Sequence, residues 1–337
     1  MHPSASGETP ACRAIITGTG AHVPQKTLTN DDLVQMVDTS DEWITTRTGI
    51  KVRHITTDEE STAMLASNAA KEAIHTAGID PKELDLIVVG TITPEMVFPS
   101  TACFVQMETG ATTATAFDIS AACCGFVYAL AIAQQFIASG QAQKVLVIGA
   151  DALTKVVNWQ DRASCILFGD GAGAAVLERS TDPDRGILYS TTGSDGHGWK
   201  ALNCQAYGSR YPASRPLDDP NKKFMSINGR EIYQQAVRRI VESVEECLDQ
   251  CKLSTDQVKK FIFHQMNARI IESASKRLNL PDEKVFINIA KYGNTSAASI
   301  PIALHECIQT KQVSKGDILI FVAFGAGTTW GANVVCL

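Results

Sequence analysis

The 337-residue sequence lacks an apolar stretch long enough to cross a bilayer. Its longest, such as residues 145–153, falls well short of the roughly 20 residues that a membrane helix needs. It also lacks a basic surplus, because 30 lysines and arginines stand against 36 aspartates and glutamates, a formal net charge of −6. Nucleic acids and anionic membranes are bound by broad basic surfaces. The composition therefore argues against both as partners and leaves room only for a small basic patch.

The ten cysteines lack the spacing of a metal site or a disulfide framework. They form no Cys-x-x-Cys pair and no cluster with histidine, and a chain of this size does not need disulfides for stability. The first residues, 1–11, contain Pro3 and Pro10 and have no apolar signal core. We therefore expect a cytoplasmic protein with reduced thiols and no bound metal, preceded by a flexible extension over residues 1–11.

Short β-rich segments alternate with helical segments along the whole sequence. The predicted strands are short, apolar and β-branched, and lie at residues 85–90, 117–120, 144–149, 260–264, 285–289 and 317–323. The predicted helices carry apolar residues at helical spacing, and lie at residues 62–77, 125–138, 268–278 and 295–307. This alternation predicts an α/β fold. Its recurrence predicts an internal duplication, with halves at residues 12–180 and 181–337.

Two glycine-containing segments do not follow this plan. Residues 194–228 are rich in Gly, Pro, Asn, Asp and Lys and show no periodicity, so we expect a loop or cap over a site. Residues 169–173 (GDGAG) resemble a phosphate-binding loop, but a strand-like run follows them and the Lys-Ser/Thr pair of such a loop is missing. Nucleotide hydrolysis is therefore not expected.

A pair of cysteines lies where a predicted strand meets a predicted helix, in the run SAACCGF at residues 120–126. The free N–H groups and the dipole at a helix N-terminus favour a thiolate, and the small neighbours leave room for a substrate. Cys123 and Cys124 point in different directions, because neighbours on a helix diverge by about 100°. The residues alone do not decide which cysteine reacts, and packing of both in the core is the alternative.

Three further segments carry polar groups to strand ends. His264 ends a predicted strand, where ligands bind in α/β sheets, although a structural histidine is the alternative. Asn294 occupies the same place in the second half that Cys123 has in the first, and could donate to a substrate oxygen or cap a helix. The glycine-rich turn at residues 324–331 brings backbone N–H groups close to a ligand, unless it is simply a tight turn.

Together these segments resemble the β-ketoacyl-[acyl-carrier-protein] synthase III family, the condensing enzymes that start bacterial fatty acid synthesis. The matches follow one another along the chain, at residues 39–44 (TSDEWI), 46–50 (TRTGI), 98–100 (FPS), 120–126 (SAACCGF), 168–174 (FGDGAGA), 264–267 (HQMN), 293–299 (GNTSAAS) and 324–331 (FGAGTTWG). The resemblance implies a thiolase-like fold, in which two duplicated halves stack as five αβαβα layers.

The resemblance also implies site residues. The family nucleophile matches Cys123, and Cys124 stands where many members have Ala, which implies packing. The other catalytic positions match His264 and Asn294. The N–H groups of Cys123 and Ala326 match the oxyanion hole. The acyl pocket matches Phe98 and Phe324, and Phe98 reaches across a homodimer interface in the family.

The implied reaction has two substrates and no cofactor. Cys123 takes the acyl group from an acyl-CoA, acetyl-CoA being the expected primer, and malonyl-acyl-carrier protein then condenses with it after losing CO₂. The residues that match CoA contacts are Trp43, Arg47, Arg162, Gly229 and Tyr233. The acidic carrier protein is expected to dock on basic residues of one helix, namely Arg269, Lys276 and Arg277.

Three other functions fit parts of the same pattern. A related acyltransferase would use Cys123 but would not need both His264 and Asn294. A condensing enzyme of secondary metabolism would share all three residues. A non-catalytic homologue that only binds carrier protein is disfavoured, because all three residues are intact.

Overall fold

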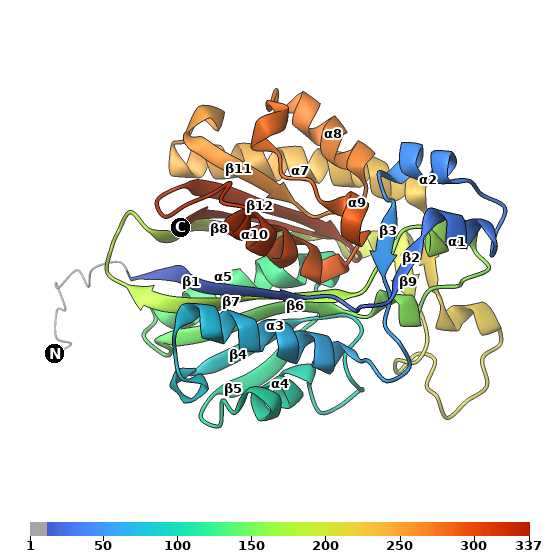
Figure 1. The fold of residues 1–337 in the computed structure, drawn as a ribbon, viewed down its shortest axis with the longest axis horizontal. Coiled ribbons are helices and arrows are strands. Elements are labelled where there is room, and N and C mark those ends of the chain that lie inside the picture. Colours follow the sequence, from blue (N-terminus) through green and yellow to red (C-terminus); the bar gives the residue numbers. More distant parts are fainter. Residues whose placement is uncertain (1–11) are drawn as a thin grey trace.

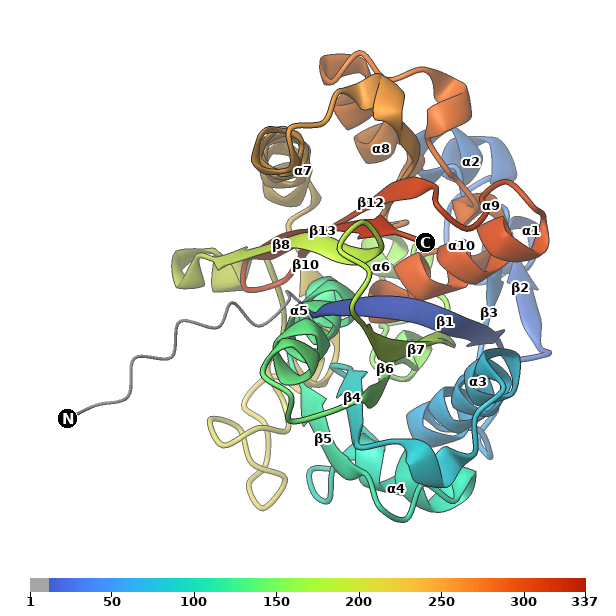
Figure 2. The same ribbon diagram turned by 90° about the vertical axis from the view of Figure 1, so that its left-hand side faces the viewer.

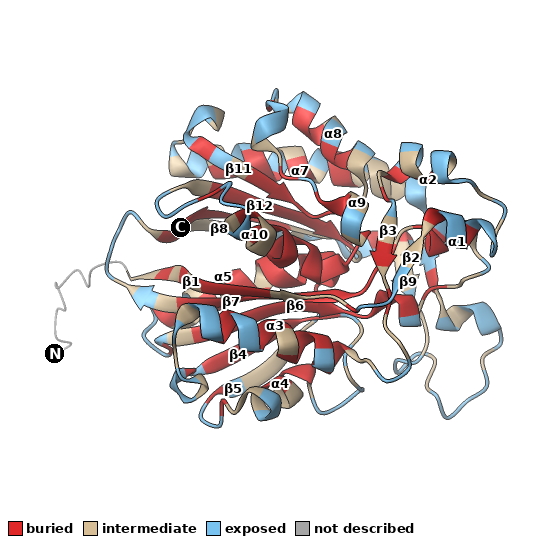
Figure 3. Cartoon of the chain, in the orientation of Figure 1, coloured by how far each residue is buried: buried red, intermediate tan, exposed pale blue. Residues whose placement is uncertain are grey.

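Two β-sheets lie face to face in the computed structural model, with helices between them and on both outer faces (Figure 1). The structure describes residues 12–337, so the extension expected over residues 1–11 lies outside the described residues. Buried residues are concentrated in the two sheets and in the helices between them (Figure 3). No helix within residues 12–337 has both the length and the apolar character to span a membrane.

The first sheet mixes parallel and antiparallel neighbours. Its strands, in spatial order, are β1 (Arg13–His22), β7 (Gly171–Ser180), β6 (Lys144–Asp151), β4 (Leu86–Gly90) and β5 (Thr115–Ile119). The strands β4, β5 and β6 run parallel, whereas β7 runs antiparallel to both β1 and β6. Its outer face is covered by α3 (Thr62–Ala77) and α4 (Thr101–Thr109).

The second sheet repeats this plan. Its strands, in spatial order, are β8 (Gly186–Ser194), β13 (Thr329–Cys336), β12 (Ile318–Gly325) and β11 (Val258–Phe263), and only β11 and β12 are parallel. A single parallel bridge from Phe261 to Val285 takes the place that β5 has in the first sheet. The outer face is covered by α7 (Gly229–Cys251) and α8 (Ala268–Arg277). The two sheets therefore have equivalent topologies, as a duplication requires.

The central layer contains the helices α5 (Gly125–Ala138) and α10 (Ser299–Gln309), one from each half of the chain (Figure 2). Each follows a short 3₁₀ turn, η2 (Ala122–Cys124) or η8 (Ser296–Ala298). Ala122 and Ser296 both adopt left-handed backbone angles, with φ of 47° and 50°. The turns η2 and η8 contact each other, so the duplicated plan brings the Cys123 and Asn294 segments together at the centre of the molecule.

The predicted helices at residues 62–77 and 125–138 are confirmed with the same bounds as α3 and α5. The predicted strand at 285–289 is wrong beyond its single bridge, because the side-chain amide of Gln265 replaces the neighbouring strand. Its Nε2 donates to the carbonyl of Phe286 at 3.2 Å, and its Oε1 accepts the N–H of Asn288 at 3.0 Å. The chain then enters the short helix α9 (Ile289–Tyr292).

Smaller elements gather at one end of the sheets, where Figure 1 shows α1, α2, β2, β3 and β9 together. One group is β2 (Thr27–Thr29), α1 (Asn30–Val34), α2 (Asp41–Thr48) and β3 (Val52–His54). The expected cap at 194–228 is mostly irregular, with a short antiparallel pair formed by β9 (Leu202–Cys204) and β10 (Met225–Ile227). The helix α6 (Arg162–Cys165) lies beside β10. Run 169–173 leads into β7 and not into a helix, so it has no phosphate-loop geometry.

Candidate active site

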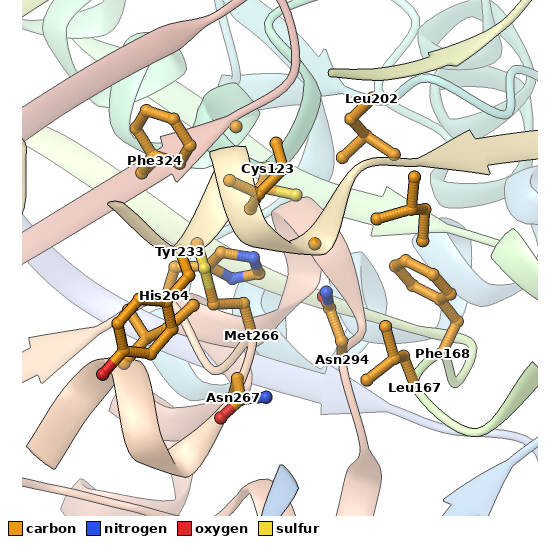
Figure 4. Close-up of a pocket in the computed structure, with 15 residues that line it drawn as sticks. Cys123, Leu167, Phe168, Leu202, Tyr233, His264, Met266, Asn267, Asn294 and Phe324 are labelled. Atoms are coloured by element: carbon orange, nitrogen blue, oxygen red, sulfur yellow. The ribbon is translucent and has the colours of Figure 1, made fainter. Parts of the chain in front are cut away.

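Cys123 lies between two cavities. The smaller, about 120 Å³, is lined by Cys123, His264 and Asn294 together with Gly229, Tyr233 and Phe324. Figure 4 shows the three polar side chains converging on it from separate segments of the chain. The larger cavity, about 510 Å³, lies on the other side of Cys123 and is lined by Ala326, Thr329 and mostly apolar residues. Cys123 therefore borders both cavities.

Cys123 and Cys124 differ in what they face. Cys124 lines neither cavity and packs fully buried in the core between the sheets. Burial raises the pKa of its thiol well above the ordinary value. Of the two cysteines, only Cys123 borders the cavities.

Burial opposes the thiolate that the helix N-terminus is expected to favour at Cys123. Burial raises the pKa of Cys123 to about 12, and a hydrogen bond from the hydroxyl of Ser296, 3.5 Å from the sulfur, opposes this rise together with a weaker backbone hydrogen bond. A helix N-terminus contributes at most roughly 2 kcal/mol, about 1.5 pKa units. That contribution is too small to ionise the thiol near neutral pH, so Cys123 rests protonated.

His264 is buried directly after β11, and desolvation lowers its pKa to about 3. The ring is therefore neutral at neutral pH. Its Nδ1 lies 2.6 Å from Ser299 Oγ, which also accepts the N–H of Gln265 at 3.3 Å. Among the described residues, Nδ1 is the one acceptor within reach of the Ser299 hydroxyl proton, so we assign that proton to the bond with Nδ1 and the ring proton to Nε2. The Nε2 atom has no hydrogen-bond partner among the described residues, so a donor is left for a substrate.

Asn294 is fixed through both backbone and side chain. Its N–H donates to the carbonyl of Leu167 at 2.9 Å, and its carbonyl accepts the N–H of Gly169 at 3.1 Å. Its side-chain oxygen accepts the N–H of Ser296 at 2.9 Å. Asn294 is not the helix cap considered from the sequence, because the N-cap of η8 is Thr295. The bond to Ser296 leaves the amide nitrogen of Asn294 as a donor. In Figure 4 this nitrogen points into the space near Cys123.

The glycine-rich turn comes close to the nucleophile segment. A Cβ added to Gly325 would lie 2.9 Å from the backbone nitrogen of Cys123, which is closer than atoms pack. Glycine is therefore required for this approach. Ala326, the next residue, lines the same cavity as Cys123, so the predicted oxyanion donors lie on facing segments.

The predicted CoA residues form two groups. Arg47 and Arg162 both stack on the Trp43 ring, with guanidinium carbons 4.6 and 4.8 Å from its centroid. A base held between Trp43 and Arg162 needs roughly 7 Å between the two planes, so Arg162 has to move for the predicted sandwich to form. Gly229 and Tyr233, near the start of α7, line the smaller cavity instead.

The structure separates the predicted acyl-pocket residues. Phe324 lines the smaller cavity, beside His264, and not the larger one. Phe98 lines neither and is 82% exposed. The predicted docking residues, Arg269, Lys276 and Arg277, are all exposed on α8. The helix begins at the cavity wall, because its N-cap residue Asn267 also lines the smaller cavity.

Two supporting residues were missed from the sequence. Ser299 orients His264 from 35 residues away, a contact that only the tertiary fold creates. Asp151 is fully buried and accepts five hydrogen bonds, from the segment 91–93 and from the N–H of Ala297. Burial raises its pKa, and these bonds oppose the rise. A carboxylate that ends an otherwise apolar strand was a signal that could have found it.

Comparison with known proteins identifies the family. The chain matches 3-oxoacyl-[acyl-carrier-protein] synthase III over residues 117–196 and the C-terminal part of the same family over residues 248–337. It is 52% identical to the β-ketoacyl-[acyl-carrier-protein] synthase III of Caldanaerobacter subterraneus subsp. tengcongensis over 320 residues, 95% of this chain and 96% of that protein. The chain belongs to the β-ketoacyl-[acyl-carrier-protein] synthase III family.

Solved structures agree with this family. The synthase III of Aquifex aeolicus superposes with a TM-score of 0.90 at 48% identity, covering 96% of this chain and all of that one. The priming β-ketosynthase of the R1128 polyketide pathway also reaches a TM-score of 0.90, at 33% identity, covering 98% of each chain. These similarities confirm the predicted thiolase-like, duplicated five-layer fold.

Proposed function

We propose that this synthase III family member condenses an acyl-CoA primer, acetyl-CoA in the simplest case, with malonyl-acyl-carrier protein. The products are β-ketoacyl-acyl-carrier protein, CoA and CO₂, and the reaction initiates fatty acid biosynthesis. One observation carries the proposal: a thiol and two neutral donors, on Cys123, His264 and Asn294, line a single cavity.

In the first step Cys123 takes the acyl group. Its sulfur bonds to the thioester carbon, the carbonyl oxygen becomes an oxyanion, and the bond to the CoA sulfur then breaks. The proton of the Cys123 thiol ends on the departing CoA sulfur, so charge and atoms balance. The N–H groups of Cys123 and Ala326 stabilise the oxyanion, each such donor typically contributing roughly 3 to 4 kcal/mol.

In the second step malonyl-acyl-carrier protein loses CO₂ and leaves an enolate. The Nε2–H of His264 and the side-chain amide of Asn294 donate to the enolate oxygen. A neutral His264 suits this role, because its Nε2–H donates a hydrogen bond to the enolate without transferring the proton, as a more acidic imidazolium would. The carbanion then attacks the acyl carbon of the Cys123 thioester. The bond from that carbon to sulfur breaks, and Cys123 leaves as a thiolate. Decarboxylation makes the step favourable, so the proposal includes no metal ion or redox cofactor.

The proposed partners follow the same scheme. CoA binds near Trp43, Arg47 and Arg162 and reaches Cys123 past Gly229 and Tyr233. The carrier protein docks on Arg269, Lys276 and Arg277. We further propose a cytoplasmic homodimer in which Phe98 of the partner subunit closes the acyl pocket.

A dedicated secondary pathway is the second candidate function. The likeness to the priming β-ketosynthase of the R1128 polyketide pathway, at a TM-score of 0.90 and 33% identity, favours it. A simple acyltransferase fits less well, since it does not need both free donors.

Intact-protein mass spectrometry tests the proposal. The wild type is incubated with a panel of acyl-CoAs and then with malonyl-acyl-carrier protein. We expect acylation at Cys123, followed by discharge and release of a β-ketoacyl product. Cys123→Ser should abolish acylation, whereas Cys124→Ser should retain it. An acyl group that malonyl-carrier protein does not discharge would point to the acyltransferase, and one found on Cys124 would overturn the assignment.

A further inference from the structure

The two proposed oxyanion donors belong to segments about 200 residues apart in the sequence. Cys123 lies in η2, after β5, and Ala326 lies in the turn between β12 and β13. Nothing in the chain's connectivity fixes their separation. An oxyanion hole works only when its donors are placed within about 0.5 Å of the productive geometry. A contact between the two segments is therefore needed at this point.

The hydroxyl of Thr329 makes such a contact. Its Oγ1 lies 3.1 Å from the carbonyl oxygen of Ala121 and 3.1 Å from that of Ala326. The first acceptor lies one peptide unit before the N–H of Cys123, and the second lies one unit after the N–H of Ala326. Thr329 is the first residue of β13 and pairs with Gly325 of β12, so its backbone is held in place by the sheet.

We propose that Thr329 is a positioning residue that sets the distance between the two oxyanion donors. One hydroxyl proton is shared between two carbonyl acceptors, and each accepting peptide adjoins a donating one. This inference rests on the proposed function, because it requires the N–H groups of Cys123 and Ala326 to bind an oxyanion.

The neighbouring residue offers a matched control. The hydroxyl of Thr328 lies 3.5 Å from Gln235 Oε1 on α7. The two threonines are adjacent in the chain, but only the hydroxyl of Thr329 contacts the carbonyl oxygens of Ala121 and Ala326. Removing the Thr328 hydroxyl disturbs the turn locally without loosening the bridge.

The test compares two reactions of the same sulfur. Acylation of Cys123 by an acyl-CoA forms an oxyanion, whereas alkylation by iodoacetamide does not. Single-turnover acylation and alkylation are measured for the wild type and for Thr329→Val, Thr329→Ala, Thr329→Ser and Thr328→Val. We expect acylation roughly tenfold or more slower in the Val and Ala variants, with unchanged alkylation and an unchanged KM for the acyl-CoA. Thr329→Ser should recover most of the lost rate, and Thr328→Val should stay near the wild type.

Three results would overturn the inference. Thr329→Val and Thr329→Ala could acylate at the wild-type rate, alkylation could slow as much as acylation, or Thr329→Ser could lose as much as Thr329→Ala. Using two hydroxyl-free variants keeps the test decisive if the Val variant folds poorly. If the wild type itself forms no acyl-enzyme, the proposed function fails instead, and the two failures are thereby distinguished.

Discussion

At the scale of single residues, the ionisation of Cys123 governs its reactivity. Because burial raises the pKa to about 12, the thiolate fraction should rise tenfold for each pH unit between pH 7 and 9. We therefore expect the rate of iodoacetamide alkylation at Cys123 to rise about tenfold per unit over this range. Peptide mass mapping after timed alkylation measures this rate, and the exposed residue Cys204 serves as the internal reference.

A Ser296→Ala variant adds a control with a definite sign. The Ser296 hydroxyl stabilises the thiolate and lowers the pKa of Cys123, so its removal should slow alkylation at every pH in this range. A rate that levels off near pH 8.5, the ordinary pKa of a cysteine thiol, or below it would contradict the argument from burial.

Ser299 is predicted to act through His264. Its hydroxyl donates to Nδ1 and keeps the ring proton on Nε2. Ser299→Ala should slow decarboxylation of malonyl-carrier protein roughly two- to tenfold, the value of one ordinary hydrogen bond. Acylation of Cys123 should change less, because the enolate donors act only in the second step. Release of CO₂ from the preformed acyl-enzyme is the measurement.

Ser275→Ala is the matched control for that experiment. Ser275 is also a buried serine, but its hydroxyl donates to the carbonyl of Ile271 within α8 and not to His264. Equal decarboxylation rates in the two variants would count against an orienting role for Ser299.

At the scale of elements, the closest packing lies where the catalytic turn η8 meets β6. A Cβ added to Gly149 of β6 would lie 2.1 Å from the carbonyl oxygen of Ala297. Gly149→Ala therefore forces the turn away from the sheet. Overpacking of this kind typically costs about 1 to 3 kcal/mol. We expect a lower urea midpoint and a loss of condensing activity together, since Asn294 belongs to the displaced segment.

Gly208→Ala serves as the comparison, because an added Cβ there meets nothing within 4 Å. Its urea midpoint and activity should match the wild type. A Gly149→Ala protein that is equally stable would show that the turn can shift without cost, and the packing argument would be wrong.

The sequence predicted those elements whose signal is local. The helices α3 and α5 have the bounds that their apolar periodicity indicated, and the segments carrying Cys123 and Asn294 do meet at equivalent places. The strand at 285–289 was wrong because a side chain, Gln265, provides the hydrogen bonds that a strand neighbour would otherwise give. The periodicity of the sequence cannot reveal that a side chain takes the place of a strand.

The contacts that support the site could not be predicted from the sequence for the same reason. The bond from Ser299 to His264 and the bridge from Thr329 to Ala121 join residues 35 and 208 positions apart. The pKa of Cys123 also depends on burial by distant segments, an effect that its place at a helix N-terminus does not reveal. Resemblance to a family supplied the identity of the nucleophile, but not the contacts that hold it.

At the scale of the whole molecule, the larger cavity is too big for the simplest primer. An acetyl group occupies only the volume of a few water molecules, each about 30 Å³, whereas the cavity measures about 510 Å³. Most of this space would remain empty around an acetyl group in a single chain. If acetyl-CoA is the primer, the remaining space is left to water or to a side chain from outside the chain.

Exposed apolar side chains near this cavity suggest what fills it. Val97 and Phe98 are 87% and 82% exposed, and Ile92, which lines the cavity, begins the same loop. Exposed apolar clusters of this kind mark interfaces. We expect sedimentation equilibrium to show a dimer for the wild type at micromolar concentration and a monomer for the double variant Val97→Asp, Phe98→Asp. Met36→Asp, a change at a similarly apolar surface position near α1, should remain dimeric.

The monomeric variant should also change its choice of primer. With Phe98 of the partner subunit removed, the cavity stays open, and each added methylene of a longer acyl-CoA gains about 0.8 kcal/mol, roughly a fourfold preference. The ratio of octanoyl to acetyl transfer onto Cys123 should therefore rise on loss of the dimer, as competition between the two acyl-CoAs followed by mass spectrometry measures. A monomer with the wild-type ratio would mean that the chain closes its own acyl pocket, and the cap at residues 194–228 would then be the element to alter.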